Sequence, residues 1–182
     1  MKSFFKHICT SLVAITAVLT SSMLFATNLQ VGMQAPDFKL QATNGDFYQL
    51  SDYQGKQAVV IAWYPMANTR GCTIECKSLT EQGHLIRAFD VSYFMISVDP
   101  LKDNRAFAKK TGADFPMLSD PSKVTAKAYD VLNLFRVASR VTFYISKQGK
   151  ILRIDEDVTP KTAAEDIAKQ LEYLSIEKAN KK

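Results

Sequence analysis

The sequence predicts an α/β protein in which helices cover a mixed central sheet. Segments with the composition of strands and of helices alternate along most of the chain, which is typical of layered α/β folds. Near the end, two strand-like segments, 141–145 and 151–154, are separated only by Ser146-Lys-Gln-Gly149. Such a hairpin makes part of the sheet antiparallel. A chain of 182 residues with 47% hydrophobic residues can form one domain with a substantial core.

The first half of the chain is expected to supply a hairpin, two further strands and a long helix. Asn44-Gly45 is a typical hairpin turn between the first two strands. The predicted elements are, in order, strands at 38–40, 47–50 and 58–64, a helix from Cys72 to about Phe89, and a strand at 92–98. The apolar positions expected on the inner face of this helix are Ile74, Leu79, Leu85 and Ile86.

Three later helices are each expected to begin with a capping side chain followed by a proline at the first helical position. The three pairs are Asp99-Pro100, Asp120-Pro121 and Thr159-Pro160. The first of these helices is expected to end at Gly112. In the last one, Thr162 and Glu165 have the spacing of a capping box, and the apolar stripe consists of Ile167, Leu171 and Leu174.

Residues 1–26 have the pattern of a secretory signal peptide. Lys2 and Lys6 precede an uncharged apolar stretch from Ile8 to Phe25, and Ala26 is a small residue suited to a cleavage site. An uncleaved membrane anchor is the alternative, although Thr and Ser interrupt the stretch. We expect an exported, periplasmic protein with one domain over 27–178, a basic tail at 179–182 and no stable membrane association after cleavage.

The charge and cysteine content narrow the function further. Cleavage of residues 1–26 would remove two basic residues and lower the net charge from +5 to +3, which gives no case for nucleic-acid binding. It would also leave only Cys72 and Cys76 of the three cysteines, in a compartment where disulfides persist. A disulfide closing so short a loop adds little stability. Redox chemistry or metal binding is the more natural use of this pair.

Cys72 is the candidate reactive residue because it lies where a buried strand leads through a short turn into a helix. Unpaired N–H groups and the positive end of the helix dipole favour the thiolate there, and the thiolate is the reactive form. Pro65 and Gly71 bracket the turn, and Thr69 can place a hydroxyl beside the sulfur. The alternative for this stretch is an inert, buried cysteine.

The motif Pro65-x₃-Thr69-x₂-Cys72 resembles the active site of the peroxiredoxins. Gly71-Cys-Thr-Ile-Glu75, Ser97-Val-Asp99 and an arginine, Arg140, just before a strand resemble the Q-type (bacterioferritin comigratory protein) branch. The resemblance covers residues 31–174. It implies an AhpC/TSA-like redoxin domain with a thioredoxin-like fold and an N-terminal β-hairpin extension.

The resemblance also implies a role for each residue of the motif. Cys72 would be the peroxidatic nucleophile, and Thr69 would hydrogen-bond the thiolate and the peroxide. Arg140 would hold the thiolate and polarise the peroxide, while Pro65 would shield the site from water. No metal, haem or flavin is implied. The implied partners are a peroxide and a thioredoxin-like or other thiol reductant, and we expect a monomer or weak dimer.

Cys76 departs from the pattern, because Q-type proteins with a resolving cysteine on the same helix usually have four residues between the two. Here three residues separate Cys72 from Cys76. Residues at this spacing have Cβ atoms about 5–6 Å apart in an intact helix, whereas a disulfide needs roughly 3.5–4.5 Å. Cys76 as resolving cysteine, an external resolving thiol, and a structural Cys76 all remain open.

The main rival is a copper-binding protein similar to the SCO-type chaperones, since two thiolates and an imidazole suit copper. Those proteins carry a histidine where this chain has Arg140, and His84 is better interpreted as a helix-surface residue. A thiol-disulfide oxidoreductase is a weaker rival, because Cys-x₂-Cys is absent. Asp155-Glu-Asp157 is interpreted as a solvated turn. The aromatic residues expected in the core are Trp63, Tyr64, Phe94, Phe107, Phe143 and Tyr144.

Overall fold

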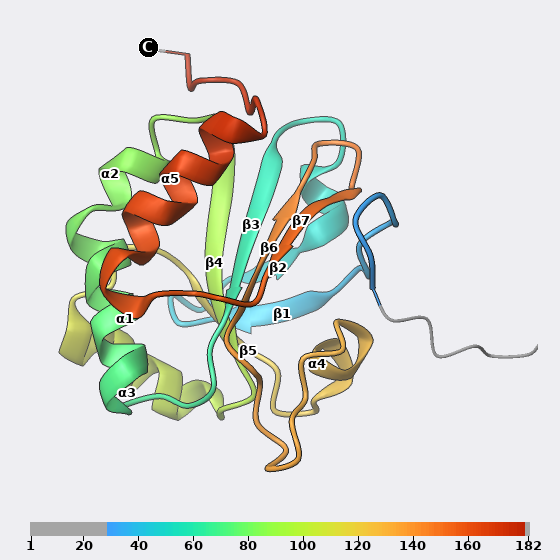
Figure 1. The fold of residues 1–182 in the computed structure, drawn as a ribbon. Helices are drawn as coiled ribbons and strands as arrows, with labels where there is room; N and C mark the ends of the chain where they lie inside the picture. Colours follow the sequence, from blue (N-terminus) through green and yellow to red (C-terminus); the bar gives the residue numbers. More distant parts are fainter. Residues whose placement is uncertain (1–28, 181–182) are drawn as a thin grey trace, which may run out of the picture.

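The computed structural model describes residues 29–180, which form one seven-stranded mixed sheet in the order β2-β1-β5-β4-β3-β6-β7 (Figure 1). The predicted signal peptide, 1–26, lies outside the described residues. The strands β3, β4 and β5 are parallel, whereas β6 pairs antiparallel with β3, and β1 with β5. The strands are β1 (Lys39–Ala42), β2 (Phe47–Gln49), β3 (Ala58–Trp63), β4 (Val91–Ser97), β5 (Met117–Ser119), β6 (Val141–Ile145) and β7 (Ile151–Asp155). The predicted mixed α/β sheet with an N-terminal hairpin is confirmed.

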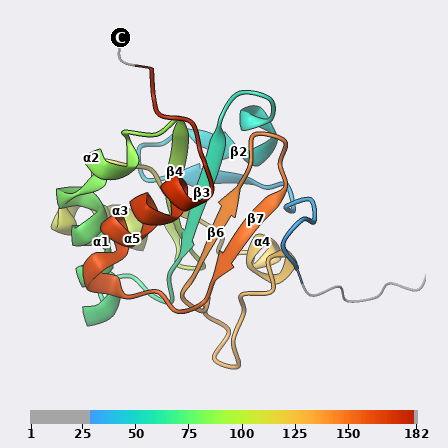
Figure 2. The same ribbon diagram turned by 45° about the horizontal axis from the view of Figure 1, so that its top comes forward.

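Helices cover both faces of the sheet, but unequally. One face carries α1 (Arg70–Glu81), α2 (Gly83–Ile86), α3 (Leu101–Thr111) and α5 (Ala163–Tyr173), the last preceded by the short turn η2 (Pro160–Thr162). The other face carries η1 (Leu50–Tyr53) and α4 (Val124–Ala128). Figure 2 shows α1, α2 and α5 together on one side of the sheet, with α4 on the other.

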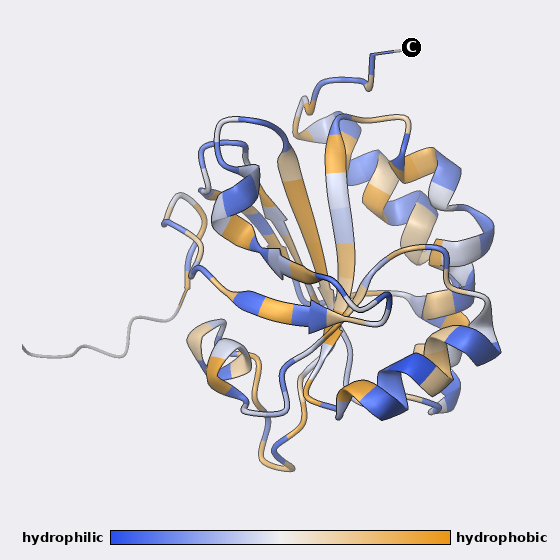
Figure 3. Ribbon diagram, turned by 180° about the vertical axis from the view of Figure 1, so that it is seen from behind, coloured by the Kyte–Doolittle hydropathy of each residue, from blue (hydrophilic) through white to orange (hydrophobic). Residues whose placement is uncertain are grey.

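The core is divided into two layers by β3, all six residues of which are buried. Val59, Ile61 and Trp63 belong to the layer under α4, whereas the alternating residues Val60 and Ala62 belong to the layer under α1. Figure 3 shows the hydrophobic residues concentrated on the central strands and the polar residues on the outer faces of the helices. The aromatic residues predicted to be in the core are all buried there, namely Trp63, Tyr64, Phe94, Phe107, Phe143 and Tyr144.

The predicted single helix from Cys72 to Phe89 is wrong in its middle, because the chain breaks at Gln82 into α1 and α2. Gly83 follows the break and approaches the sheet closely: a Cβ at this position would lie 2.6 Å from the hydroxyl oxygen of Tyr93. Leu79 and Ile86 are buried as expected, but Ile74 faces solvent. The break at Gln82 interrupts the apolar stripe, whereas Ile74 is exposed within the unbroken helix α1.

The predicted proline caps are mostly wrong in their details. Pro100 is itself the N-cap of α3, and the carboxylate of Asp99 instead accepts a hydrogen bond from the backbone N–H of Ala67, 2.8 Å away. The helix α4 begins only at Val124, after Asp120-Pro121, but the carboxylate of Asp120 accepts a hydrogen bond from the backbone N–H of Ala126 in its first turn, at 2.8 Å. Neither of these prolines is the first helical residue, because each helix starts further along the chain.

The other predicted helix ends are partly confirmed. Gly112 caps α3 with a left-handed backbone, φ 72°, as expected. Pro160 opens the turn η2, but Thr159 makes no side-chain cap there. The hydroxyl of Thr162 donates to Asp166 at 2.5 Å, so the capping box with Glu165 is not formed.

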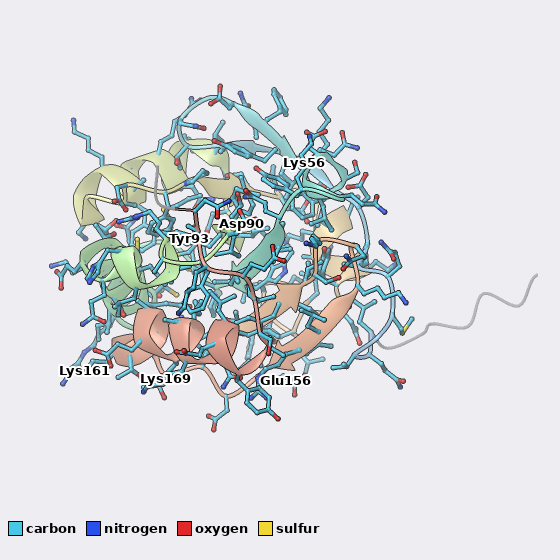
Figure 4. The ribbon with its side chains drawn as sticks, turned by 90° about the horizontal axis from the view of Figure 1, so that it is seen from above. Lys56, Asp90, Tyr93, Glu156, Lys161 and Lys169 are labelled. Atoms are coloured by element: carbon cyan, nitrogen blue, oxygen red, sulfur yellow. The ribbon has the colours of Figure 1, made fainter. Side chains whose placement is uncertain are left out.

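The segment between α4 and β6 projects from one end of the molecule (Figure 1). Leu134 and Phe135, at the tip of this loop, are 99% and 86% exposed. Seen from above, Lys161 and Lys169 lie at the periphery of the molecule, whereas Tyr93 lies toward its middle (Figure 4). Among residues 29–180, no helix combines the length and the hydropathy needed to cross a membrane.

Candidate active site

Cys72 is the third residue of α1, at the point where β3 has ended and a short loop turns into the helix. The side chain is 1% exposed and lies in the core layer under α1. Thr69 is the N-cap, and Asn68 before it has a positive φ of 63°, a conformation that asparagine tolerates better than most residues. The predicted position of Cys72 at a helix N-terminus is therefore confirmed, with the positive end of the helix dipole at the sulfur.

Arg140, the residue before β6, contacts Cys72 in the first turn of α1. Its Nη2 donates a hydrogen bond to the sulfur of Cys72 at 3.3 Å, across 68 residues of sequence. The antiparallel pairing of β3 with β6 explains the approach, because Trp63, the last residue of β3, pairs with Val141, the first of β6. The loop after β3 and the residue before β6 therefore meet at the same end of these two neighbouring strands.

Glu75 is the site residue that sequence reasoning missed. Its carboxylate forms an ion pair with Nη1 of Arg140, and its side chain is only 1% exposed. The spacing in the helix accounts for this contact, since residues three apart share a face and both Glu75 and Cys72 face Arg140. A buried carboxylate is costly unless paired. An acidic residue three positions after the cysteine was the available signal.

Gly71 leaves the space that the guanidinium occupies. A Cβ at this position would lie 3.2 Å from Nη2 of Arg140, which is tighter than an ordinary van der Waals contact. The glycine therefore permits the close approach of Arg140 to the first turn of α1.

Thr69 and Pro65 lie in the loop but do not hydrogen-bond to the sulfur. The hydroxyl of Thr69 donates to the carbonyl of Met66 at 3.0 Å, and its side chain is exposed. Pro65 directly follows the buried Tyr64 and is itself partly buried. In the described part of the chain, the only side-chain hydrogen bond to the sulfur of Cys72 comes from Arg140.

Cys76 lies one turn further along α1, fully buried, and both cysteines are free thiols. Its Sγ contacts Oγ1 of Thr111, in the last turn of α3, at 3.2 Å. Burial raises the pKa of the Cys76 thiol, and hydrogen bonding with Thr111 and Thr80 acts in the opposite direction. The two sulfurs thus have different neighbours: a cation for Cys72 and a neutral hydroxyl for Cys76.

The model of the AhpC/TSA family matches residues 31–154. The chain is 33% identical to alkyl hydroperoxide reductase E of Mycobacterium tuberculosis over 72% of its length and 88% of that protein. It is 30% identical to peroxiredoxin Bcp of Bacillus subtilis, over 69% and 83% of the two chains. The crystal structure of peroxidoxin BcpB from Mycobacterium tuberculosis superposes with a TM-score of 0.72 at 27% identity, covering 80% of this chain and 97% of that one.

The chain belongs to the AhpC/TSA family. It is a peroxiredoxin, a thiol-dependent peroxidase with the thioredoxin-like fold, and its relatives place it with the bacterioferritin comigratory, or Q-type, branch. The copper-chaperone alternative is not favoured by these relatives. Within residues 29–180, no three His, Cys, Asp or Glu side chains gather as metal ligands would, and His84 is exposed on α2.

In this peroxiredoxin, buried polar groups at the strand ends support the loop that leads from β3 to Cys72. The hydroxyl of Tyr64 donates to Oδ1 of Asn104 at 2.7 Å, and Nδ2 of Asn104 donates to the hydroxyl of Ser119 at 2.8 Å. Burial raises the pKa of Tyr64 well above its ordinary value, so the phenol remains a donor. Together with the bond from Ala67 to Asp99, these contacts join the ends of β3, β4 and β5 beneath the loop. The loop is therefore a fixed platform for Cys72.

Proposed function

We propose that Cys72 is the nucleophile of this peroxidase and that it reduces hydrogen peroxide or small organic hydroperoxides. The observation that carries the proposal is the hydrogen bond from Arg140 to the sulfur of Cys72 at 3.3 Å. A guanidinium stays charged at any working pH, so it stabilises the thiolate, which is the form that attacks. The helix N-terminus adds a second source of positive potential at the same atom.

In the first step, the thiolate of Cys72 attacks one oxygen of the peroxide. A sulfur–oxygen bond forms, the oxygen–oxygen bond breaks, and the departing oxygen takes a proton and leaves as water or an alcohol. Cys72 is left as a sulfenic acid. Negative charge grows on the departing oxygen, and a fixed cation stabilises this charge more in the transition state than in the ground state. Arg140 suits this role, with the backbone N–H groups of Cys72 and Gly71 as further donors.

Thr69 and Pro65 complete the proposed site. The proton of the Thr69 hydroxyl is engaged with the carbonyl of Met66, which leaves the lone pairs of its oxygen able to accept a hydrogen bond from the peroxide O–H. Pro65 has no N–H to hydrate and limits access of water to the loop beside Cys72. These roles require the peroxide to bind between the loop and Arg140.

In the second step, we propose that Cys76 condenses with the sulfenic acid to a disulfide. A thioredoxin-like or other dithiol donor then returns two electrons to the protein. The proposal is supported by the position of Cys76 one helical turn from Cys72 in the same buried cluster. Direct attack by an external thiol on the sulfenic acid is the competing route.

We further propose that the protein works in the periplasm as a monomer or weak dimer. The support is the signal-peptide pattern of residues 1–26, with Ala26 before the proposed cleavage site. In this proposal, cleavage of residues 1–26 leaves the mature protein without stable membrane association. In an oxidising compartment the donor must be a dedicated reductant, because thiols there are not kept reduced by a bulk pool.

Intact-mass measurement of the reduced protein after one equivalent of hydrogen peroxide tests both steps. The proteins compared are residues 27–182, Cys72→Ser and Cys76→Ser, each with and without a sulfenic-acid trap. A two-cysteine peroxidase loses two hydrogens in the wild type, gives a trapped sulfenic acid in Cys76→Ser, and does not react in Cys72→Ser.

Two other outcomes would change the proposal. A trapped sulfenic acid that persists in the wild type would assign resolution to an external thiol. Slow and equal reaction of both cysteines would contradict Cys72 as the nucleophile.

A further inference from the structure

The thiol of Cys76 is tied to a different helix from the one that carries it. Its Sγ lies 3.2 Å from Oγ1 of Thr111 in α3, and both side chains are buried between α1 and α3. The hydroxyl of Thr111 already donates its proton to the carbonyl of Phe107, at 2.8 Å. Its oxygen therefore accepts from Cys76, which means that Cys76 is bound as the protonated thiol.

The partner helix is well anchored at this point. Thr111 is the last residue of α3, Gly112 caps the helix, and the backbone N–H of Ala113 bonds to the carbonyl of Ala108 at 3.1 Å. Phe107, one turn before Thr111, is fully buried in the same cluster as Cys76. The Thr111 hydroxyl, which accepts the hydrogen bond from the Cys76 thiol, is therefore held in place by the anchored end of α3.

Formation of the Cys72–Cys76 disulfide requires Cys76 to leave this position. In an intact helix the two Cβ atoms are about 5–6 Å apart, whereas a disulfide needs roughly 3.5–4.5 Å. The thiol must also lose its proton before it can attack, and burial raises the pKa of Cys76 in its resting position. Loosening of α1 and release from Thr111 must therefore precede the reaction.

We propose that Thr111 is a positioning residue that holds Cys76 away from Cys72 and thereby prolongs the lifetime of the Cys72 sulfenic acid. This inference rests on the proposed function, in which Cys76 resolves. The step that Thr111 delays is attack of the released Cys76 thiolate on the sulfur of the Cys72 sulfenic acid. A sulfur–sulfur bond forms, the sulfur–oxygen bond breaks, and the hydroxide leaves as water with the proton from Cys76.

The delay has a chemical consequence for the enzyme. While Cys76 is held by Thr111, the sulfenic acid is open to an external thiol or to a second peroxide, which would oxidise it to the sulfinic acid. Thr111 thus sets the competition between internal resolution and these two reactions.

The test is the lifetime of the sulfenic acid in Thr111→Val and Thr111→Ser. Valine keeps the shape of threonine but cannot accept from Cys76, whereas serine keeps the hydroxyl. Trap is added at increasing times after one equivalent of peroxide, and the trapped fraction is read by intact mass. Thr111→Val removes the hydrogen bond between Cys76 and Thr111, which is at most of ordinary strength. We therefore expect the lifetime of the Cys72 sulfenic acid to be about two- to fivefold shorter in this variant. Thr111→Ser keeps the wild-type lifetime, and the first step, followed by the fluorescence of the single tryptophan, Trp63, is unchanged in both.

Thr125→Val is the matched control, because Thr125 is equally buried but lies in α4 on the opposite face of the sheet. A second readout needs no peroxide: in a Cys72→Ser background, Thr111→Val should increase the rate at which iodoacetamide alkylates Cys76. An unchanged or longer lifetime in Thr111→Val, or equal shortening in Thr111→Ser or Thr125→Val, would overturn the proposal.

Failure of the proposed function gives a different result. If Cys76 does not resolve, the wild type and Cys76→Ser have the same sulfenic-acid lifetime. If Cys76 resolves but Thr111 does not hold it, the wild type has a shorter lifetime than Cys76→Ser, and Thr111→Val matches the wild type.

Discussion

The guanidinium of Arg140 forms an ion pair with the buried carboxylate of Glu75 through one nitrogen, while its other terminal nitrogen donates to Cys72. The planar fork of arginine allows both contacts at once, which a lysine ammonium could not reproduce with the same geometry. Glu75 is 1% exposed and Arg140 19% exposed, so water competes little for the carboxylate. The pair therefore fixes the direction in which the cation faces the sulfur.

Glu75→Gln should slow the reaction with peroxide, although the variant retains both Cys72 and Arg140. Without the carboxylate, the guanidinium loses the partner that orients it, and misplacement of a catalytic group by about 1 Å can lower a rate by up to roughly 100-fold. We expect a second-order rate constant about ten- to 100-fold lower, measured by stopped-flow fluorescence. Glu81→Gln, on the exposed part of the same helix, is the control. A rate within twofold of the wild type would show that Glu75 is dispensable for orientation.

Arg140→Ala should have a larger effect, because it removes the cation itself. Loss of one fixed donor at a developing negative charge lowers turnover by about 10²–10³-fold in well-studied sites. We expect a decrease of this order in the peroxide rate constant at pH 7, with Arg140→Lys intermediate because it keeps the charge and loses the fork. Arg136 is exposed in the same loop, a few residues before Arg140, and Arg136→Ala should react like the wild type. Unchanged peroxide reactivity in Arg140→Ala would remove Arg140 from the proposed mechanism.

Gly71→Ala should affect stability and activity in opposite directions. Alanine favours a helix over glycine by about 0.8–1.0 kcal/mol, which raises the free energy of unfolding if the neighbours can adjust. The added Cβ, 3.2 Å from Nη2 of Arg140, must displace the guanidinium by a few tenths of an ångström and so weaken its contact with Cys72. Urea unfolding and peroxide kinetics on the same sample separate the two effects. A faster reaction in Gly71→Ala would contradict the assigned geometry.

The buried tyrosines predict loss of stability at alkaline pH. Burial raises the pKa of Tyr64, Tyr129 and Tyr144 above the ordinary value of 10.0, so these phenols bind protons in the folded protein that the unfolded chain releases. The contribution of these neutral phenols to the free energy of unfolding is fully present below pH 10. It is lost as the pH rises toward their raised pKa values in the folded protein. Each such group should lower the free energy of unfolding by about 1.4 kcal/mol per pH unit above pH 10.

Tyr144→Phe provides the direct check of this pH dependence. The variant should show a shallower decrease of unfolding free energy between pH 10 and 11, measured by urea unfolding, because one buried phenol has been removed. Tyr173→Phe, at an exposed position, should leave the slope as in the wild type. Identical slopes in wild type and Tyr144→Phe would mean that this phenol is not ionising on unfolding.

The parts of the fold that depend on local sequence patterns could be predicted from the sequence. The run of buried residues in β3, the turn at Asn44-Gly45 and the glycine cap at Gly112 each have a short-range signal, and each element formed where expected. The Asp-Pro pairs predicted the helix starts incorrectly. Asp99, for example, is a typical capping residue, but its carboxylate accepts a hydrogen bond from the distant backbone N–H of Ala67.

The candidate site was only partly predictable for a similar reason. Cys72 and Arg140 could be named from a motif, although their contact depends on the pairing of β3 with β6. Glu75 stood in the Gly71–Glu75 motif without an assigned role, and only the position of Arg140 in space shows why it is buried. The bond from Cys76 to Thr111 spans 35 residues and has no signal in the spacing of either residue.

The register that pairs Trp63 with Val141 also determines when the enzyme becomes reactive during folding. Contacts between distant segments form late, because closing a long loop must precede any gain from the pairing. Until β6 lies beside β3, Arg140 cannot donate its hydrogen bond to Cys72, so the thiolate lacks this stabilisation. We therefore expect a newly made molecule to react more slowly with peroxide at Cys72 until this pairing has formed. Full reactivity toward peroxide is expected only once β6 has joined the sheet.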